Sequence, residues 1–257
     1  MQAKLRDYIR IDLQRAFGNP KFLGGVLGVC IVLLYNNYIP AAMIGWISEM
    51  TSISALSIAA FLFASYPFAT SFCEDKEFRY DMQVILRGNS MCYVCSRLFV
   101  VFLSSFFTML AGFLFAAFFI YLKYGLTSQS AIDNISSGQG HYYQFAVQGN
   151  EILYTLCAGL QIGSLAGSLA VVGLICSLFI RNRMLVYILP SAMLYIEDIL
   201  VQRFWGWKVG SVFSLRSMGI ATLQFTVEGQ SWQLYYFEIF MILLGCSAIA
   251  CWKIGRR

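Results

Sequence analysis

The chain has 257 residues, of which 59% are apolar and only 12% are charged, and its formal net charge is +5. An average soluble domain carries about 25% charged residues. This composition therefore excludes an ordinary soluble protein and predicts an all-α integral membrane protein. We read the small positive charge as a signal of membrane orientation, not of nucleic-acid binding.

The first 20 residues predict an amphipathic helix that precedes the membrane spans. Between residues 3 and 18 one helical face is apolar and the other is mainly basic. The apolar face consists of Leu5, Tyr8, Ile9, Leu13, Ala16 and Phe17. Gly18, Asn19 and Pro20 end the pattern. We expect residues 1–20 to lie in the membrane interface; the alternative is a helix packed on the protein itself.

Residues 21–257 predict a domain of six transmembrane helices. A helix needs about 20 apolar residues to cross the roughly 30 Å hydrocarbon layer. Six runs approach or exceed that length, at about 21–39, 52–73, 92–122, 152–180, 184–201 and 234–252. Pro67 and Pro190 lie inside two of these runs, where proline can kink a helix. The fourth run carries small residues that permit close helix approach, namely Gly163, Ser164, Gly167, Ser168 and Gly173.

The basic residues orient the six predicted spans. If both termini are cytoplasmic, the inner segments hold fourteen of the 18 lysines and arginines and the outer segments hold four. The four outer ones are Lys123, Arg203, Lys208 and Arg216. Such an excess marks the cytoplasmic side. We therefore expect a multi-pass protein of the plasma membrane, and we see no cleavable signal peptide.

A charged segment between the second and third runs predicts a cytoplasmic helix that a soluble partner can bind. Residues 74–97 read EDKEFRYDMQVILRGNSMCYVCSR. At helical spacing the apolar side chains form one stripe with charged groups beside it. The residues we expect to contact the partner are Glu74, Glu77, Phe78, Asp81, Met82, Ile85, Leu86 and Arg87.

The segment before the last run predicts a re-entrant element on the outer face. Residues 202–233 are too aromatic for a solvated loop and too often broken by glycine to span the membrane. Among the ionisable residues in or beside it, the candidates for a role there are Glu197, Asp198, Arg203, Arg216 and Glu238. The acidic ones either line an outward-opening path or pair with the arginines and anchor the segment.

Several of these features resemble one protein family. The stretch after the second run has an acidic beginning, an apolar pair, Arg-Gly, and then a serine, a tyrosine and a basic residue. Here these are Glu74 to Glu77, Ile85-Leu86, Arg87-Gly88, Ser90, Tyr93 and Arg97. With the amphipathic start and the re-entrant segment, the chain resembles permease subunits of bacterial ATP-binding-cassette exporters, in the bacitracin- and lantibiotic-exporter branch. It departs from that branch at Tyr80-Asp81, where Gly-Thr is common, and at Arg97, where lysine is frequent.

The resemblance implies how such a protein works. Two permease subunits, identical or homologous, would form one pathway through the bilayer. Separate cytoplasmic ATPases would bind ATP and Mg, so this chain would hold no cofactor of its own. The substrate would be an antimicrobial peptide, a drug or another amphipathic compound.

Two other classes stay open from the sequence. A membrane scaffold or immunity protein that sequesters a toxin would have the same fold. An intramembrane enzyme would need catalytic side chains within the spans, but the one histidine, His141, lies in a predicted outer loop and no Gly-Lys pair for an ATP-binding loop exists. We therefore expect no catalytic and no metal site in this chain.

Overall fold

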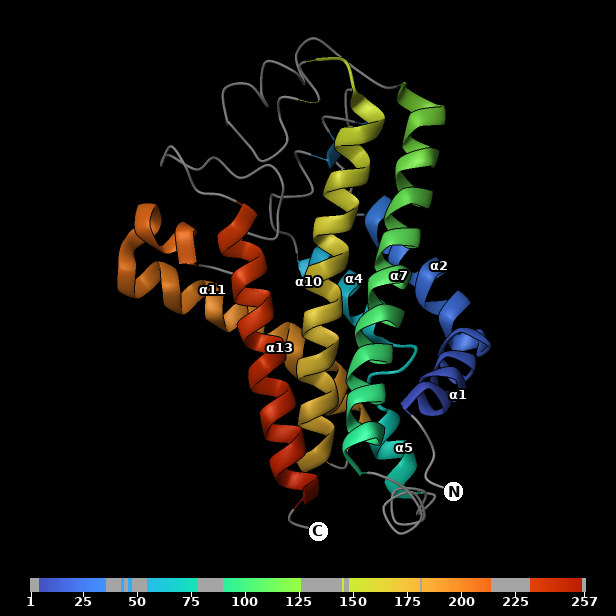
Figure 1. Cartoon of the computed structure of the whole chain (residues 1–257). Helices are drawn as coiled ribbons and strands as arrows, with labels where there is room; N and C mark the ends of the chain where they lie inside the picture. Colours follow the sequence, from blue (N-terminus) through green and yellow to red (C-terminus); the bar gives the residue numbers. More distant parts are fainter. Residues whose placement is uncertain are drawn as a thin grey trace.

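Figure 1 shows the computed structural model of the chain, a bundle of α-helices. It describes residues 5–35, 43, 46–47, 55–77, 90–125, 145, 148–180, 182–213 and 232–255. The helices within these ranges are α1 (Leu5–Phe17), α2 (Pro20–Tyr35), α4 (Ala55–Ser65), α5 (Ser71–Glu77), α7 (Ser90–Tyr124), α10 (Glu151–Phe179), α11 (Arg183–Phe213) and α13 (Trp232–Gly255). No strand occurs among the described residues, so the prediction of an all-α protein is confirmed.

Two of the described helices are long and apolar enough to cross a membrane. They are α7 and α10, over Met91–Tyr124 and Glu151–Phe179. A third span is possible by length if α1 and α2, which meet at an angle of 55°, are counted together. Arg183–Met193 and Ile239–Lys253 are shorter apolar helices. The protein thus has the helices of a membrane-embedded protein, and the number of spans beyond these stays a prediction.

The predicted second span is not one continuous helix. The helix α4 ends at Ser65, and α5 begins only at Ser71 after a turn over residues 66–70. Pro67 explains the break, since it has no N–H to donate and its ring disfavours helical geometry in the residue before it. The sequence indicated a kink at Pro67, and the structure has a full interruption that turns α5 into a separate short helix.

The helix α10 forms the centre of the bundle, where it contacts α4, α5, α7, α11 and α13. Two of its glycines pack against phenylalanine side chains of α7. A Cβ atom on Gly163 would lie 3.2 Å from the ring of Phe106, and one on Gly167 would lie 2.8 Å from the ring of Phe102. Gly173 faces Pro190 of α11 in the same way, at 3.0 Å. The small residues of the fourth run therefore do permit close helix approach, as predicted.

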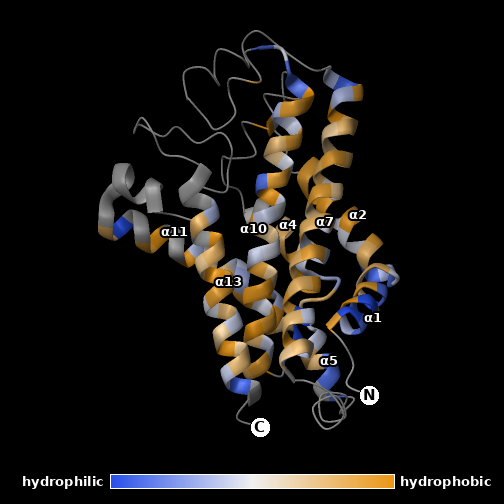
Figure 2. Ribbon diagram, in the orientation of Figure 1, coloured by the Kyte–Doolittle hydropathy of each residue, from blue (hydrophilic) through white to orange (hydrophobic). Residues whose placement is uncertain are grey.

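The N-terminal helix α1 lies against α7, as Figure 1 shows. Its apolar face joins one hydrophobic cluster with α5, α7 and α10; the α1 members are Tyr8, Ile9, Leu13, Ala16 and Phe17. The helix α1 is therefore packed on the protein itself, and its place in the membrane interface stays a prediction. Figure 2 shows hydrophilic residues concentrated on α1 and α5, at the same end of the bundle.

The helix α11 continues beyond the predicted end of the fifth span. It runs to Phe213, so its last 12 residues, 202–213, belong to the segment expected to be re-entrant. Residues 214–231 of that segment lie outside the described residues. Figure 1 shows that the far part of α11 bends away from the long axis of α10 and does not continue along it.

Candidate functional site

The short helix α5 carries three carboxylates that pair with basic residues on four other helices. Asp75 pairs with Arg15 of α1 and Arg97 of α7, Glu74 pairs with Lys21 of α2, and Glu77 pairs with Arg183 of α11. Only seven residues long, α5 is too short to be stable on its own. These ion pairs, with the burial of Phe72, tie it to the bundle. We call α5 and these partners the α5 ion-pair cluster.

Arg97 is the buried centre of this cluster. Its side chain has no exposed surface, and its guanidinium pairs with Asp75, of which 2% is exposed. A second carboxylate, Asp12 of α1, lies 3.5 Å from Nη1 of the same guanidinium. Burying a charge is costly unless opposite charges and hydrogen bonds replace the lost water. Two carboxylates supply the opposite charge around Arg97 and join α1, α5 and α7 at one point, while Nε and Nη1 of the guanidinium have no hydrogen-bond partner among the described residues.

Neighbouring side chains complete the environment of the two carboxylates. The hydroxyl of Tyr93 donates a hydrogen bond of 2.5 Å to Asp75, and Ser96 donates one of 2.6 Å to Asp12. The rings of Phe68 and Tyr93 lie 5.0 Å and 5.4 Å from the Arg97 Cζ atom, close enough for cation–π attraction. Each buried charge therefore has several polar or aromatic neighbours.

Burial governs the ionisation of Asp12. Loss of solvent raises the pKa of its carboxyl above the ordinary 3.8, although Arg97 and the Ser96 hydrogen bond act in the opposite direction. The charged form of Asp12 is thus held at a cost in folding free energy. Asp12 also lies farther than Asp75 from the guanidinium of Arg97.

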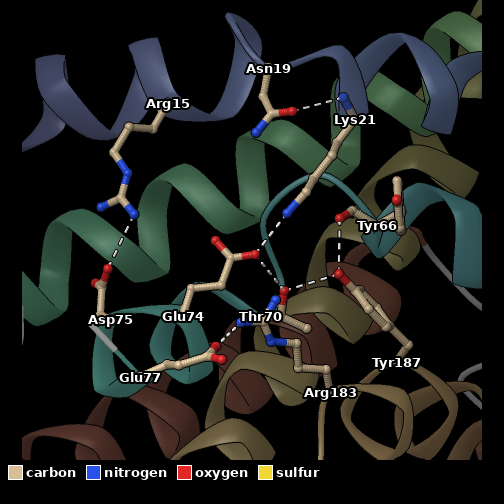
Figure 3. Close-up of polar contacts among 10 residues, drawn as sticks. All are labelled: Arg15, Asn19, Lys21, Tyr66, Thr70, Glu74, Asp75, Glu77, Arg183 and Tyr187. Atoms are coloured by element: carbon tan, nitrogen blue, oxygen red, sulfur yellow. Dashed lines mark hydrogen bonds and ion pairs between the residues drawn. The ribbon is translucent and has the colours of Figure 1, made fainter. Parts of the chain in front are cut away.

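Glu74 begins a chain of polar contacts that ends on α11, drawn in Figure 3. Its carboxylate lies 2.7 Å from the Lys21 Nζ and accepts a hydrogen bond of 3.5 Å from the Thr70 hydroxyl. That hydroxyl lies 3.0 Å from the hydroxyl of Tyr187, which also donates to the carbonyl oxygen of Tyr66 at 3.3 Å. The turn between α4 and α5 is thereby linked to α2 on one side and α11 on the other.

Glu77 and Arg183 form the exposed edge of the cluster. Their side chains pair directly, and 60% of Glu77 and 44% of Arg183 is exposed. Figure 3 shows this pair at the end of α5, next to the Tyr187 contact made one turn further along α11. Since Glu77 is the last residue of α5, the pair lies directly before Phe78, the first apolar residue predicted to contact the partner.

The structure brings together two of the residues predicted to contact a partner, Glu74 and Glu77, and shows that both also make ion pairs within the chain. The other six lie outside the described residues: Phe78, Asp81, Met82, Ile85, Leu86 and Arg87.

The structure describes only some of the ionisable residues that the sequence placed in or beside the outer segment. Glu197 and Asp198 are in α11 and Glu238 is in α13, but their side chains are not described. Arg203 is exposed on α11, and Arg216 lies outside the described residues. Whether these residues line a path or anchor the re-entrant segment stays an open prediction.

Three residues at or beside the centre of the cluster were not predicted as site residues, namely Asp12, Asp75 and Arg97. A signal existed for two of them. Asp12 interrupts the apolar face of α1, four residues after Tyr8 and four before Ala16, and Arg97 lies inside the apolar run of the third span. A charge in such a position needs a buried partner. Which partner it takes depends on helix packing and could not be read from spacing.

The residues that the structure describes contain no group of three or more His, Cys, Asp or Glu side chains placed to hold a metal ion. The eight cysteines are free thiols. Each ion pair found among the described residues involves a residue of α5 or Arg97.

Comparison with known protein families, with curated proteins and with solved structures finds no match for this chain. The resemblance to exporter permeases therefore rests on the sequence features alone and stays a prediction.

Proposed function

We propose that this chain is the transmembrane subunit of an ATP-binding-cassette exporter, which forms the substrate pathway and is driven by separate cytoplasmic ATPase subunits. In this proposal the six predicted runs all span the plasma membrane, both termini are cytoplasmic, and the α5 end of the bundle faces the cytoplasm. The proposal assigns no catalysis to this chain, since ATP and Mg would be bound by the partner.

The observation that supports the proposal best is the position of α5 in the chain. It contains the start of residues 74–90, the segment predicted to bind a soluble partner, and it is paired with α1, α2, α7 and α11. A displacement of that segment would reach four helices through α5. A protein that only sequesters a ligand has no need of such a connection.

The proposed mechanism follows from this arrangement. The apolar stripe of Phe78, Met82, Ile85 and Leu86 would occupy a groove on the ATPase, in the helix-in-groove mode. Charges beside the stripe would set the register of the contact. When the ATPase subunits close on nucleotide, the segment would move, and α5 would pass that movement to the membrane helices. A second permease subunit, identical or homologous, would complete the pathway.

The test is purification of the chain from its native membranes in mild detergent, followed by assay for a co-purifying ATPase. We expect the wild-type chain to retain one. Met82→Asp should lower the retained ATPase more than about tenfold, because an aspartate buried in an apolar groove loses its hydration. Gln83→Asp is the matched control, since it adds the same charge beside the predicted stripe.

Two results would contradict the proposal. The first is a wild-type chain that is active without any ATPase, and the second is equal retention of the ATPase by Met82→Asp and Gln83→Asp. Both variants must reach the membrane in wild-type amounts for the comparison to count. Absence of nucleotide-dependent efflux in cells would instead favour the scaffold or immunity protein.

A further inference from the structure

The ion pairs of α5 differ sharply in their burial. At Asp75 the paired arginine, Arg97, is fully buried, whereas at Glu77 both partners are largely exposed. The two carboxylates are only two residues apart, so one short helix has a buried ion pair in its middle and an exposed ion pair at its end.

This difference makes the two attachments unequal in strength. Separating Arg97 from Asp75 would leave a charge uncompensated inside the protein, which costs several times more than breaking an ion pair in water. The Glu77–Arg183 pair can open cheaply because water and salt replace each partner. Thermal motion and binding partners therefore act first on the Glu77 end.

From this we infer that α5 moves as a lever whose hinge is Asp75, because the ion pair with Arg97 holds that residue in place. The Glu77–Arg183 pair, which we call the clasp, opens and releases the first turn of α11. The inference concerns how the proposed partner-binding segment would act, and it rests on the proposed function only for the cause of opening. The existence of the clasp and the hinge can be tested in the chain alone.

The contacts of α11 define what opening would release. Arg183 and Tyr187 lie one turn apart on α11, and both are bound to the segment around α5. Tyr187 contacts Thr70 and the Tyr66 carbonyl, so it would keep α11 in register when Arg183 is released. The expected motion is a loosening of the first turn of α11, with little change around Arg97.

The first experiment uses amide hydrogen exchange of the whole chain in lipid nanodiscs, without any partner. Raising NaCl from about 50 mM to about 1 M shortens the screening length from roughly 14 Å to 3 Å. We expect exchange in residues 183–187 to become about 1.5- to 5-fold faster, the range set by an exposed ion pair. Exchange in residues 8–16 and 91–97, around the buried Arg97, should stay unchanged.

Two variants separate the clasp from a general effect of salt. Glu77→Gln and Arg183→Gln should each give the faster exchange at low salt and should remove the response of residues 183–187 to added salt. Glu151→Gln is the control, because Glu151 begins α10 at the far end of the bundle (Figure 1). It should leave both the rate and the salt response unchanged.

A second experiment adds the partner, taken as whatever ATPase co-purifies with the chain, and compares the nucleotide-free and vanadate-trapped states. Trapping should speed exchange at residues 183–187 in the wild type and should have no further effect in Glu77→Gln. If no ATPase co-purifies, the proposed function fails while the clasp measured in the chain alone still holds.

The inference is overturned by either of two results in the chain alone. One is an unchanged exchange rate at residues 183–187 in Glu77→Gln and in high salt. The other is equal acceleration around Arg97, which would mean that α5 is released as a whole and has no hinge.

Discussion

Arg97 of α7 and Asp75 of α5 form an ion pair in which both side chains are buried, although 21 residues, including most of those predicted to contact a partner, separate them in the chain. Residues 76–96 therefore lie between two positions that a buried ion pair joins. A partner that bound the predicted contact residues would act on a segment whose two ends are held together by this pair.

Loss of the Asp75 carboxylate should strongly destabilise the protein. Asp75→Ala leaves the Arg97 charge with only the more distant Asp12, and removal of one partner of a buried pair costs about 3–5 kcal/mol. Thermal unfolding in detergent measures this effect. The control is the triple variant Asp12→Leu, Asp75→Leu and Arg97→Met, which removes all three charges together. It should recover most of the lost stability, and a triple variant as unstable as Asp75→Ala would contradict the charge argument.

Loss of the Asp12 carboxylate should have a smaller effect that depends on pH. Since burial raises the pKa of Asp12 above 3.8, the folded protein binds a proton more readily than the unfolded chain does. Asp12 therefore makes the wild type less stable as pH rises from about 4 through the raised pKa. Asp12→Asn lacks this titration and keeps a group that can accept the Ser96 hydrogen bond.

The measurement is the difference in unfolding free energy between Asp12→Asn and the wild type at two pH values. The unfolding free energy of Asp12→Asn minus that of the wild type should be larger at pH about 7 than at pH about 4.5, because only the wild type loses stability as Asp12 ionises. The opposite trend would show that Arg97 stabilises the Asp12 anion by more than burial costs it.

The sequence predicted the helical class and the small-residue packing face, because each is a local pattern. Glycines at helical spacing indicate a close helix contact wherever the neighbour is, and the neighbour proved to be the Phe102 and Phe106 face of α7. The pairing of Arg97 with Asp12 and Asp75 could not be predicted in the same way. It joins residues 85 and 22 positions apart, so it depends on how α1 and α5 dock on α7.

The interruption of the predicted second span could not be predicted from the sequence for a different reason. Run 52–73 is apolar enough to be taken as one helix, and composition alone does not decide whether Pro67 bends or interrupts it. The break produced α5, and with it the cluster of carboxylates that the sequence placed in a single long coupling segment. A proline near a charged stretch was the one available signal that the helix would restart.

Two glycine-to-alanine changes, one at the contact of α10 with α7 and one on α13, should have opposite effects on stability. In Gly167→Ala the new Cβ would lie 2.8 Å from the Phe102 ring and 3.0 Å from its carbonyl oxygen, so helix α7 must shift. Overpacking of this kind costs about 1–3 kcal/mol. In Gly245→Ala on α13 the new Cβ meets no atom within 4 Å, so the better helix propensity of alanine should leave stability unchanged or higher. Thermal midpoints of the two variants should differ in this order.

The link between Tyr187 and Thr70 should be measurable as a coupling energy. Tyr187→Phe and Thr70→Val each remove one hydroxyl, and each should cost about 0.5–1.5 kcal/mol in unfolding free energy. Because the two hydroxyls contact each other at 3.0 Å, the double variant should cost less than the sum of the single ones. Strict additivity would mean that the two hydroxyls do not bond each other, and that Tyr187 holds α11 at this end through the Tyr66 carbonyl oxygen without Thr70.

The proposed orientation can be tested by chemical labelling of intact cells. In the six-span arrangement Glu77 is cytoplasmic and Asn150 is on the outer face, and both residues are exposed in the structure. A membrane-impermeant maleimide added to cells should label Asn150→Cys above the background of the eight native thiols, and it should leave Glu77→Cys at that background. Opening the cells should then make Glu77→Cys reactive. Labelling of Glu77→Cys from outside would place α5 on the outer face, where no cytoplasmic ATPase could reach it, because the bilayer separates the two compartments.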